Sequence, residues 1–145
     1  MVIPDVNLLI YAYDSRSPYH QRARKWWEGL LNGEREVGLT WPVIRGFLRI
    51  TTQRAFAEEP LSGEKAREYI DSWLCRSVVT NLVEGPDHWK LFSKVLVESG
   101  VSGPLISDAV LATYAIEYRA ELHSNDLDFG RFSGFRWVNP LETRA

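Results

Sequence analysis

The stretch AELHSNDLDF, residues 120–129, decides the fold because a strand-like run gives way to polar and acidic residues within it. Residues 120–123 form a short strand-like run, and Asp126 and Asp128 follow it, two residues apart. The chain opens in the same way, because the apolar run from Met1 ends on Asp5. In an open parallel sheet, ligands bind beyond the carboxyl ends of the strands. The acids of this stretch therefore either start a turn or bind a ligand, and the rest of the chain has to distinguish the two.

Strand-like and helix-like segments alternate along the whole sequence. Apolar or alternating runs predict strands at residues 1–5, 36–40, 77–83, 120–123 and 135–138. Apolar residues at helical spacing predict helices at 7–13, 18–32, 41–52, 63–74, 87–100 and 105–118, with Ser17-Pro18 and Ser62 as start signals and Gly100 as a stop signal. Short strands separated by helices are typical of an α/β domain with a mostly parallel sheet, here of five strands. No repeat or linker divides the chain, so we expect one domain over residues 1–145.

The composition is that of an ordinary globular protein, with 45% hydrophobic and 25% charged residues. No apolar run reaches the roughly 18–20 residues of a membrane span, and Met1 leads into a strand rather than a signal peptide. A formal net charge of -2 excludes the strongly basic surface of many nucleic-acid binders, so any such site has to be local. The single cysteine, Cys75, fits a reducing cytoplasm and is expected in the core, as are most of the six tryptophans.

Three acids are candidates for one site. Asp5 ends the first strand, Asp126 follows the fourth, and Asp108 lies near the start of the most apolar helix. If the first and fourth strands are neighbours, Asp5 and Asp126 converge, and a helix over that edge brings Asp108 to the same place. Converging carboxylates repel one another unless a cation neutralises them, and oxygen ligands suit Mg²⁺ or Mn²⁺ better than Zn²⁺. Such a site would support metal-assisted hydrolysis of a phosphodiester.

Each acid also has a purely structural explanation. Asp5 could begin a turn, Asp108 could interact favourably with its helix dipole, and Asp126 could cap the turn before Phe129. For a single acid the structural explanation is the better one. For the three together, their shared position near the carboxyl ends of the strands favours a site.

Four short motifs carry a family resemblance. They are Pro4-Asp5-Val6-Asn7-Leu8-Leu9, Phe47-Leu48-Arg49-Ile50, Ser107-Asp108-Ala109-Val110-Leu111-Ala112 and Ser124-Asn125-Asp126-Leu127-Asp128-Phe129, and the closing Phe135-Arg136-Trp137-Val138-Asn139-Pro140-Leu141 adds to them. In this order they resemble the PIN-domain ribonucleases, specifically the VapC toxins of bacterial toxin–antitoxin pairs. The resemblance covers essentially the whole chain and implies a three-layer α/β/α fold.

The resemblance also implies a function and a set of roles. It implies a Mg²⁺- or Mn²⁺-dependent endoribonuclease, cytoplasmic and homodimeric, that is silenced by a VapB-type antitoxin. The family's metal ligands map onto Asp5 and Asp108, with Asp126 completing the acidic cluster. Asn7 and Ser124 match supporting positions that orient a carboxylate or a water molecule. Asp128 matches a variable position, and we expect it only to start the turn into Phe129.

One departure from the family pattern concerns the helix at residues 41–52. Many PIN domains carry a glutamate there, and the matching position in this chain is Gly46. A site with one carboxylate fewer would hold its metal more loosely. An alternative function is therefore a catalytically weakened PIN-like module that binds RNA or a protein partner. A metal phosphohydrolase for small phosphate esters is a further alternative, but the chain has no Gly-rich phosphate loop.

Basic and aromatic residues offer a local RNA-binding surface. Arg49 and Arg45 lie one helical turn apart, and the planar guanidinium of Arg49 is the better candidate for a phosphate near the acids. The alternative is that these arginines pair with Glu58, Glu59 or Glu64. Trp26 and Trp27 are adjacent on one helix and cannot both point inward, so one of them could cover a homodimer or antitoxin surface.

Overall fold

A five-stranded sheet forms the middle of the molecule in a computed structural model, which describes residues 1–56 and 59–142. The strands are β1 (Val2–Pro4), β2 (Val37–Thr40), β3 (Val79–Leu82), β4 (Glu121–His123) and β5 (Arg136–Val138), arranged in the order β3-β2-β1-β4-β5. Every neighbouring pair is parallel. The predicted five-stranded α/β architecture is therefore confirmed, and its first and fourth strands are neighbours.

The register of the sheet places the strand ends side by side. Val2 of β1 pairs with Val37 of β2, and Pro4 of β1 pairs with His123 of β4. Because all five strands run in the same direction, their carboxyl ends lie on one edge, which we call the carboxyl edge. The residues after β1 and β4, including Asp5 and the acidic loop at 124–128, lie on this edge.

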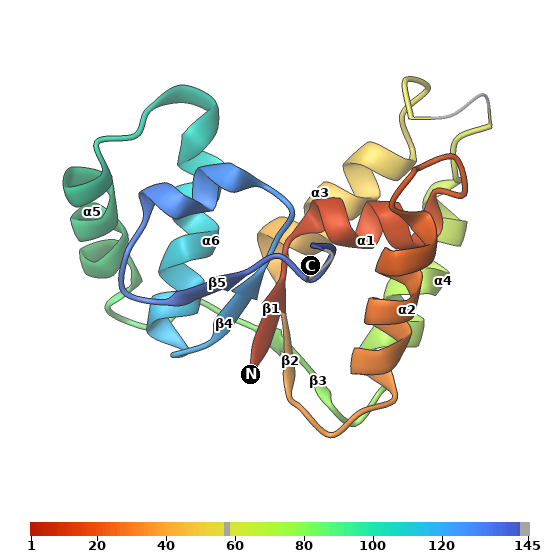
Figure 1. Ribbon diagram of the computed structural model, residues 1–145, viewed down its shortest axis with the longest axis horizontal. Coiled ribbons are helices and arrows are strands. Elements are labelled where there is room, and N and C mark those ends of the chain that lie inside the picture. Colours follow the sequence, from red (N-terminus) through yellow and green to blue (C-terminus); the bar gives the residue numbers. More distant parts are fainter. Residues whose placement is uncertain (57–58, 143–145) are drawn as a thin grey trace.

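Within the described residues, six helices cover the two faces of the sheet. They are α1 (Val6–Tyr13), α2 (His20–Leu31), α3 (Trp41–Thr51), α4 (Gly63–Leu74), α5 (His88–Ser99) and α6 (Ile106–Glu117), with short 3-10 turns η1 (Gly103–Leu105) and η2 (Leu127–Arg131). Helices α1 to α4 lie on one side of the sheet and α5 and α6 on the other (Figure 1). The three-layer α/β/α arrangement follows from this placement. Among the described residues no helix is long and apolar enough to cross a bilayer.

Helix boundaries follow the predicted signals with one difference. The Ser62 side chain accepts a hydrogen bond from the Lys65 amide and caps α4, and Gly100 ends α5 in the left-handed conformation. Helix α2, in contrast, begins at His20 rather than at Pro18. The Ser17 hydroxyl accepts a hydrogen bond from the Tyr19 amide, which closes a turn ahead of the helix instead of capping its first turn.

Aromatic side chains fill the core on the α1 to α4 side. Trp73 meets Phe47 and Trp27 edge-on, with ring centroids 4.8 Å and 5.5 Å away, and its indole N–H donates to the Tyr13 hydroxyl. Trp27 is buried, whereas its neighbour Trp26 is half-buried and donates its indole N–H to Nδ1 of His123. Trp27 therefore faces the core while Trp26 lies nearer the surface, as expected for adjacent residues on a helix. A partner surface over Trp26 stays a prediction.

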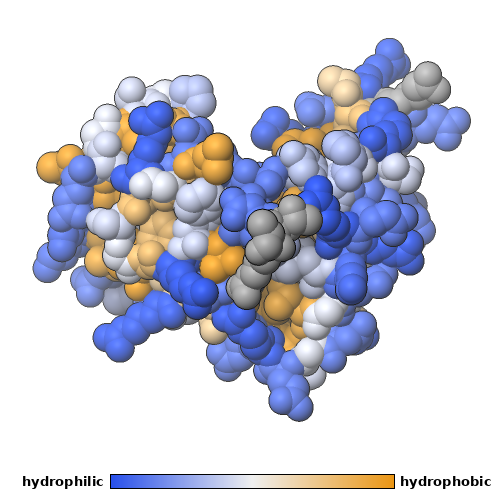
Figure 2. All heavy atoms as spheres, viewed as in Figure 1, coloured by the Kyte–Doolittle hydropathy of each residue, from blue (hydrophilic) through white to orange (hydrophobic). Residues whose placement is uncertain are grey.

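One core expectation, that of Cys75, is wrong, and two tryptophans are exceptions to the mostly buried set. Cys75 is exposed, because it is the residue that ends α4 and lies outside the buried face of that helix. Trp41 and Trp89 are 45% and 69% exposed, so two of the six tryptophans lie largely on the surface. Figure 2 shows that hydrophobic side chains on the viewed face gather mainly over the α5 and α6 half, while hydrophilic ones cover much of the other half.

Candidate active site

Asp5 is fixed at the junction of β1 and α1. It is the N-cap of α1, and its Oδ1 accepts a hydrogen bond of 2.7 Å from the Val6 amide. Its Oδ2 accepts a second hydrogen bond, of 2.6 Å, from the Ser124 hydroxyl. Both carboxylate oxygens are therefore held in place by neighbours that favour the charged form. Asp5 therefore has a structural role as a helix cap rather than as the start of a turn, and this role is compatible with a place in the site.

Ser124 connects Asp5 to the acidic loop. Its hydroxyl donates to Asp5 and accepts a hydrogen bond of 3.0 Å from the Asp126 amide. The side chain is fully buried, so this connection is shielded from solvent. The expected supporting position of Ser124 therefore has a structural basis, because the hydroxyl sets the relative positions of two acids.

The C-terminal segment braces the same loop. The indole N–H of Trp137 donates to the Ser124 carbonyl over 3.0 Å, and the Asn139 amide donates to Asn125 over 2.9 Å. Asn139 also accepts a hydrogen bond from the Leu141 amide. In the sequence these residues contributed only to the family resemblance. In the structure they support the loop that carries Asp126.

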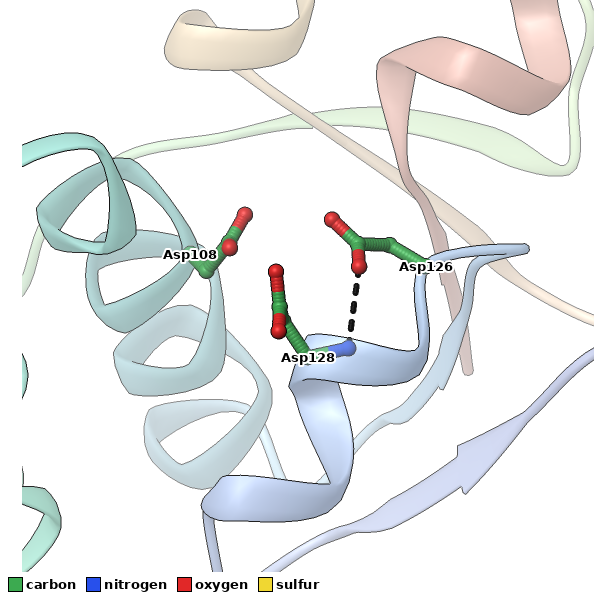
Figure 3. A group of neighbouring side chains, drawn as sticks. All are labelled: Asp108, Asp126 and Asp128. Atoms are coloured by element: carbon green, nitrogen blue, oxygen red, sulfur yellow. Dashed lines mark hydrogen bonds between the residues drawn. The ribbon is translucent and has the colours of Figure 1, made fainter.

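Asp108, Asp126 and Asp128 form a compact cluster. Each offers a carboxylate oxygen, and the three oxygens lie within 4.8 Å of one another. Asp108 comes from the first turn of α6, while Asp126 and Asp128 come from the loop after β4, and the three side chains point toward one another (Figure 3). The Asp126 carboxylate also accepts a hydrogen bond from the Asp128 amide over 2.9 Å.

The position of the Asp128 side chain differs from the sequence prediction, which gave this residue a purely structural role. Its backbone does take part in the turn into Phe129, but its carboxylate lies in the cluster with Asp108 and Asp126. The turn that Asp126 caps folds the chain back, so that the side chain two residues later faces α6. Asp5 lies beside this cluster rather than within it, because its oxygens are engaged with Val6 and Ser124.

Burial and mutual repulsion raise the pKa values of two acids. The pKa of Asp108 is raised to about 6, first by burial and then by the charges of Asp126, Asp5 and Asp128. Burial also raises the pKa of Asp5, and the nearby charge of Asp126 adds to the rise, although the hydrogen bonds from Ser124 and Val6 oppose it. The carboxylates therefore occupy a place where negative charge is costly, and a cation would relieve that cost.

Asn7 and the donor set fit a hard divalent ion. Oδ1 of Asn7 is buried and has no hydrogen-bond partner within residues 1–56 and 59–142. A buried carbonyl oxygen without a partner is unfavourable unless water or an ion completes it. The clustered carboxylates offer only oxygen donors, and Oδ1 of Asn7 would add another of the same kind, a chemistry that suits Mg²⁺ or Mn²⁺ better than a softer metal.

Helix α3 passes close to the start of α1. A Cβ atom at Gly46 would lie 3.3 Å from Cγ2 of Val6, the residue directly after Asp5. An acid at this helix position would therefore begin beside the site, and this chain lacks it. Arg45 and Arg49 lie on the exposed side of α3. No ion pair forms between Arg49 and Glu59 or Glu64 in the described part of the chain, and Glu58 lies outside it.

Asp108→Asn should stabilise the metal-free protein at pH 7. Because the pKa of Asp108 in the fold lies above its ordinary value of 3.8, its ionised form costs stability at neutral pH. That cost declines as the pH falls from about 6, where the carboxyl begins to take up a proton in the fold, to about 3.8. Asp108 is partly exposed, so solvent screening reduces the gain in the free energy of unfolding from Asp108→Asn to about 1 kcal/mol. In chelator, the thermal unfolding midpoint of Asp108→Asn should be about 2–4 °C higher than that of wild type at pH 7. The difference should be much smaller at pH 4. A lower midpoint at pH 7 would contradict this electrostatic account.

Known proteins share the sequence of this chain over almost its full length. The PIN domain model matches residues 2–134. The chain is 43% identical over 141 residues to ribonuclease VapC33 of Mycobacterium tuberculosis, which covers 97% of this chain and 99% of that protein. It is 34% identical over 140 residues to ribonuclease VapC37 of the same species, which covers 97% of each chain.

Solved structures show the same fold at low sequence identity. VapC20 of Mycobacterium tuberculosis, described as a sarcin-ricin loop cleaving toxin, matches with a TM-score of 0.68 and 15% identity, over 94% of this chain and 99% of that one. A chain of VapBC2 from Rickettsia felis, bound to a DNA fragment from its promoter, matches with a TM-score of 0.68 and 16% identity, over 96% of this chain and 98% of that one.

The family model and the acidic carboxyl edge together define the class of protein: the chain belongs to the PIN-domain family. Within that family, its sequence relatives are VapC ribonucleases over almost their full length, so it is a VapC-type protein.

Proposed function

We propose that this protein is a metal-dependent endoribonuclease toxin that hydrolyses RNA phosphodiester bonds in the cytoplasm. The observation that carries the proposal is the group of four acids on the carboxyl edge, three of them within 4.8 Å, in a chain of the VapC type. Residues 1–145 would act as a single domain. The named relatives are ribonucleases, and the acids supply the site that such a reaction requires.

Each residue of the site has a separate role in this proposal. Mg²⁺ or Mn²⁺ would be held by Asp108, Asp126 and Asp128 together with Asp5. Ser124 fixes the positions of Asp5 and Asp126 relative to each other. Asn7 would offer its unpartnered oxygen to the ion or to a water molecule. The ion, when bound, supplies a Lewis acid that activates water and stabilises the charge of the transferring phosphate. Arg49 is the candidate contact for an RNA phosphate.

The proposed protein partners are a VapB-type antitoxin, which would silence the enzyme, and a second copy of this chain. Structures with this fold include VapBC-1 from nontypeable Haemophilus influenzae, with a TM-score of 0.68 and 18% identity. An exposed acidic edge that cuts RNA is harmful to its own cell unless a partner covers it, which is the physical reason for an antitoxin.

A catalytically weakened module that binds RNA or a protein is the second candidate, and Gly46 is the observation that favours it. The α3 position that faces Val6 carries no carboxylate. Against this, Asp128 brings a carboxylate into the cluster that the sequence did not predict. The proposed site therefore has four acids despite the glycine, and we favour the enzyme.

An RNA cleavage assay on the purified protein separates the two candidates. We expect cutting in Mn²⁺ or Mg²⁺ and none in chelator, because the clustered carboxylates repel one another without a cation. The Asp5→Asn variant serves as the control for contaminating nuclease. Folded protein that cuts no faster than this variant in either metal would contradict the proposal and favour the binding module.

A further inference from the structure

Trp41 lies on the carboxyl edge, at the end of β2, one strand away from β1 and the Asp5 that follows it. In the parallel register of β1 and β2, Val2 pairs with Val37, which puts Thr40 level with Asp5. Trp41 is the next residue and the first of α3. Neighbouring strands are about 4.8 Å apart, so the backbone at Trp41 begins roughly one strand spacing from the backbone of the site.

The start of α3 turns Trp41 outward. The Thr40 side chain accepts a hydrogen bond from the Val43 amide and caps the helix, so that Val43, Ile44 and Phe47 face the core. Trp41 remains 45% exposed. In a helix the Cα–Cβ bond tilts toward the N-terminus, which for Trp41 is the direction of the carboxyl edge. A large aromatic surface is therefore left open on the carboxyl edge.

Two arginines share the outer face of α3 with Trp41. Arg45 and Arg49 follow it at spacings of four residues, which places the three side chains along one stripe. Burial raises the pKa of the Tyr114 hydroxyl on α6, and the positive charge of Arg45 is close enough to offset part of that rise. The three side chains of this stripe combine one aromatic surface with two positive charges.

This combination matches the chemistry of an RNA strand. Nucleobases stack on tryptophan, and guanidinium groups pair with phosphates. A negatively charged strand next to a group of carboxylates needs nearby positive charge, and the net charge of -2 means that this charge has to be local. A protein partner could also use tryptophan and arginine, but only the reacting RNA has to lie beside the acids.

We propose that Trp41 stacks on an unpaired base of the bound RNA next to the cleaved phosphodiester, while Arg45 and Arg49 contact its phosphates. This inference rests on the proposed ribonuclease function and deepens it, because it assigns a residue that positions the substrate. Trp41 takes no part in the chemical step. Its loss should therefore weaken RNA binding and leave metal binding at the acids unchanged.

The test measures RNA binding by fluorescence anisotropy, with a fluorescently labelled single-stranded RNA oligonucleotide and protein in chelator to prevent cleavage. Base–aromatic stacking is worth about 1–3 kcal/mol per base, so Trp41→Ala should raise Kd by about 5–150-fold. Trp41→Phe keeps an aromatic ring and should retain most of the affinity. Trp89→Ala is the matched control, because Trp89 is more exposed, at 69%, but lies on α5. It should leave Kd unchanged.

Removal of single bases from the RNA identifies stacking specifically. For the wild-type protein, one abasic position should weaken binding more than the others, and the Trp41→Ala variant should lose this sensitivity. A purely structural role of Trp41 would weaken all oligonucleotides equally and lower the thermal midpoint. In the cleavage assay, Trp41→Ala should raise KM more than it lowers kcat.

The possible outcomes separate this inference from the proposed function. If the wild type cuts RNA in metal and Trp41→Ala binds RNA as tightly as wild type, the inference is wrong while the ribonuclease stands. Equal losses in Trp41→Ala and Trp89→Ala would also overturn it. If Trp41→Ala binds RNA normally but no longer binds an antitoxin, the stripe is a protein-binding surface. A wild type that neither cuts nor binds RNA would overturn both proposals.

Discussion

Asp5→Asn should lower the RNA cleavage rate by at least about 10³-fold, because a metal site supplies several kcal/mol of charge stabilisation to the reaction. The substitution removes the negative charge and keeps the shape of the side chain. Asn can still accept the hydrogen bond from the Val6 amide through Oδ1, and its amide can donate to the Ser124 hydroxyl. Burial raises the pKa of Asp5, so the neutral side chain should fit the fold at least as well as the carboxylate.

The control for this prediction is thermal unfolding in chelator, in which Asp5→Asn should be as stable as wild type or more stable. Asp71→Asn is a matched surface variant, because Asp71 is an exposed acid on α4 that pairs with Arg67. It should cut RNA at the wild-type rate. An Asp5→Asn protein that is folded and still cuts at the wild-type rate would remove Asp5 from the site and require another centre.

The position of the site could be predicted because a parallel sheet has a simple geometry. Once β1 and β4 are neighbours, the residues after both strands lie on one edge, and Pro4 pairing with His123 brings Asp5 next to the acidic loop. The buried helix α6 carries Asp108 to the same edge from the first turn. These placements depend on strand direction and helix order, which the alternation of strands and helices along the sequence predicts.

The role of Asp128 could not be predicted, because it depends on a local turn. Two acids separated by one residue would share a face of an extended strand, but this stretch is a turn, and the sequence does not show which way a turn residue points. The turn capped by Asp126 directs the Asp128 side chain toward α6 (Figure 3). The exposure of Trp41 and of Cys75 was missed for a related reason. Both lie at helix ends, where one residue of shift decides whether a side chain faces the core or solvent.

Asp128→Asn should lower the cleavage rate by about 10–100-fold at limiting metal and raise the metal concentration needed for half-maximal cutting. The expected size is that of a residue that supports a metal site, because mutation of such residues costs about 10–100-fold in metal affinity or activity. Its carboxylate lies with those of Asp108 and Asp126, and this chain has no acid at Gly46 to replace it. Excess Mn²⁺ should restore part of the rate. A titration of RNA cleavage against Mn²⁺ concentration measures both effects.

Arg131→Gln is the matched control for Asp128→Asn. Arg131 forms an exposed ion pair of 3.4 Å with Asp128, so Asp128→Asn removes this pair as well as the carboxylate. Exposed pairs contribute little to stability, and Arg131→Gln should therefore leave the metal requirement close to that of wild type. If the two variants shift the Mn²⁺ titration equally, the ion pair explains the effect and Asp128 is only a turn residue. If only Asp128→Asn shifts it, the carboxylate belongs to the metal site, which would explain how this chain works with glycine at position 46.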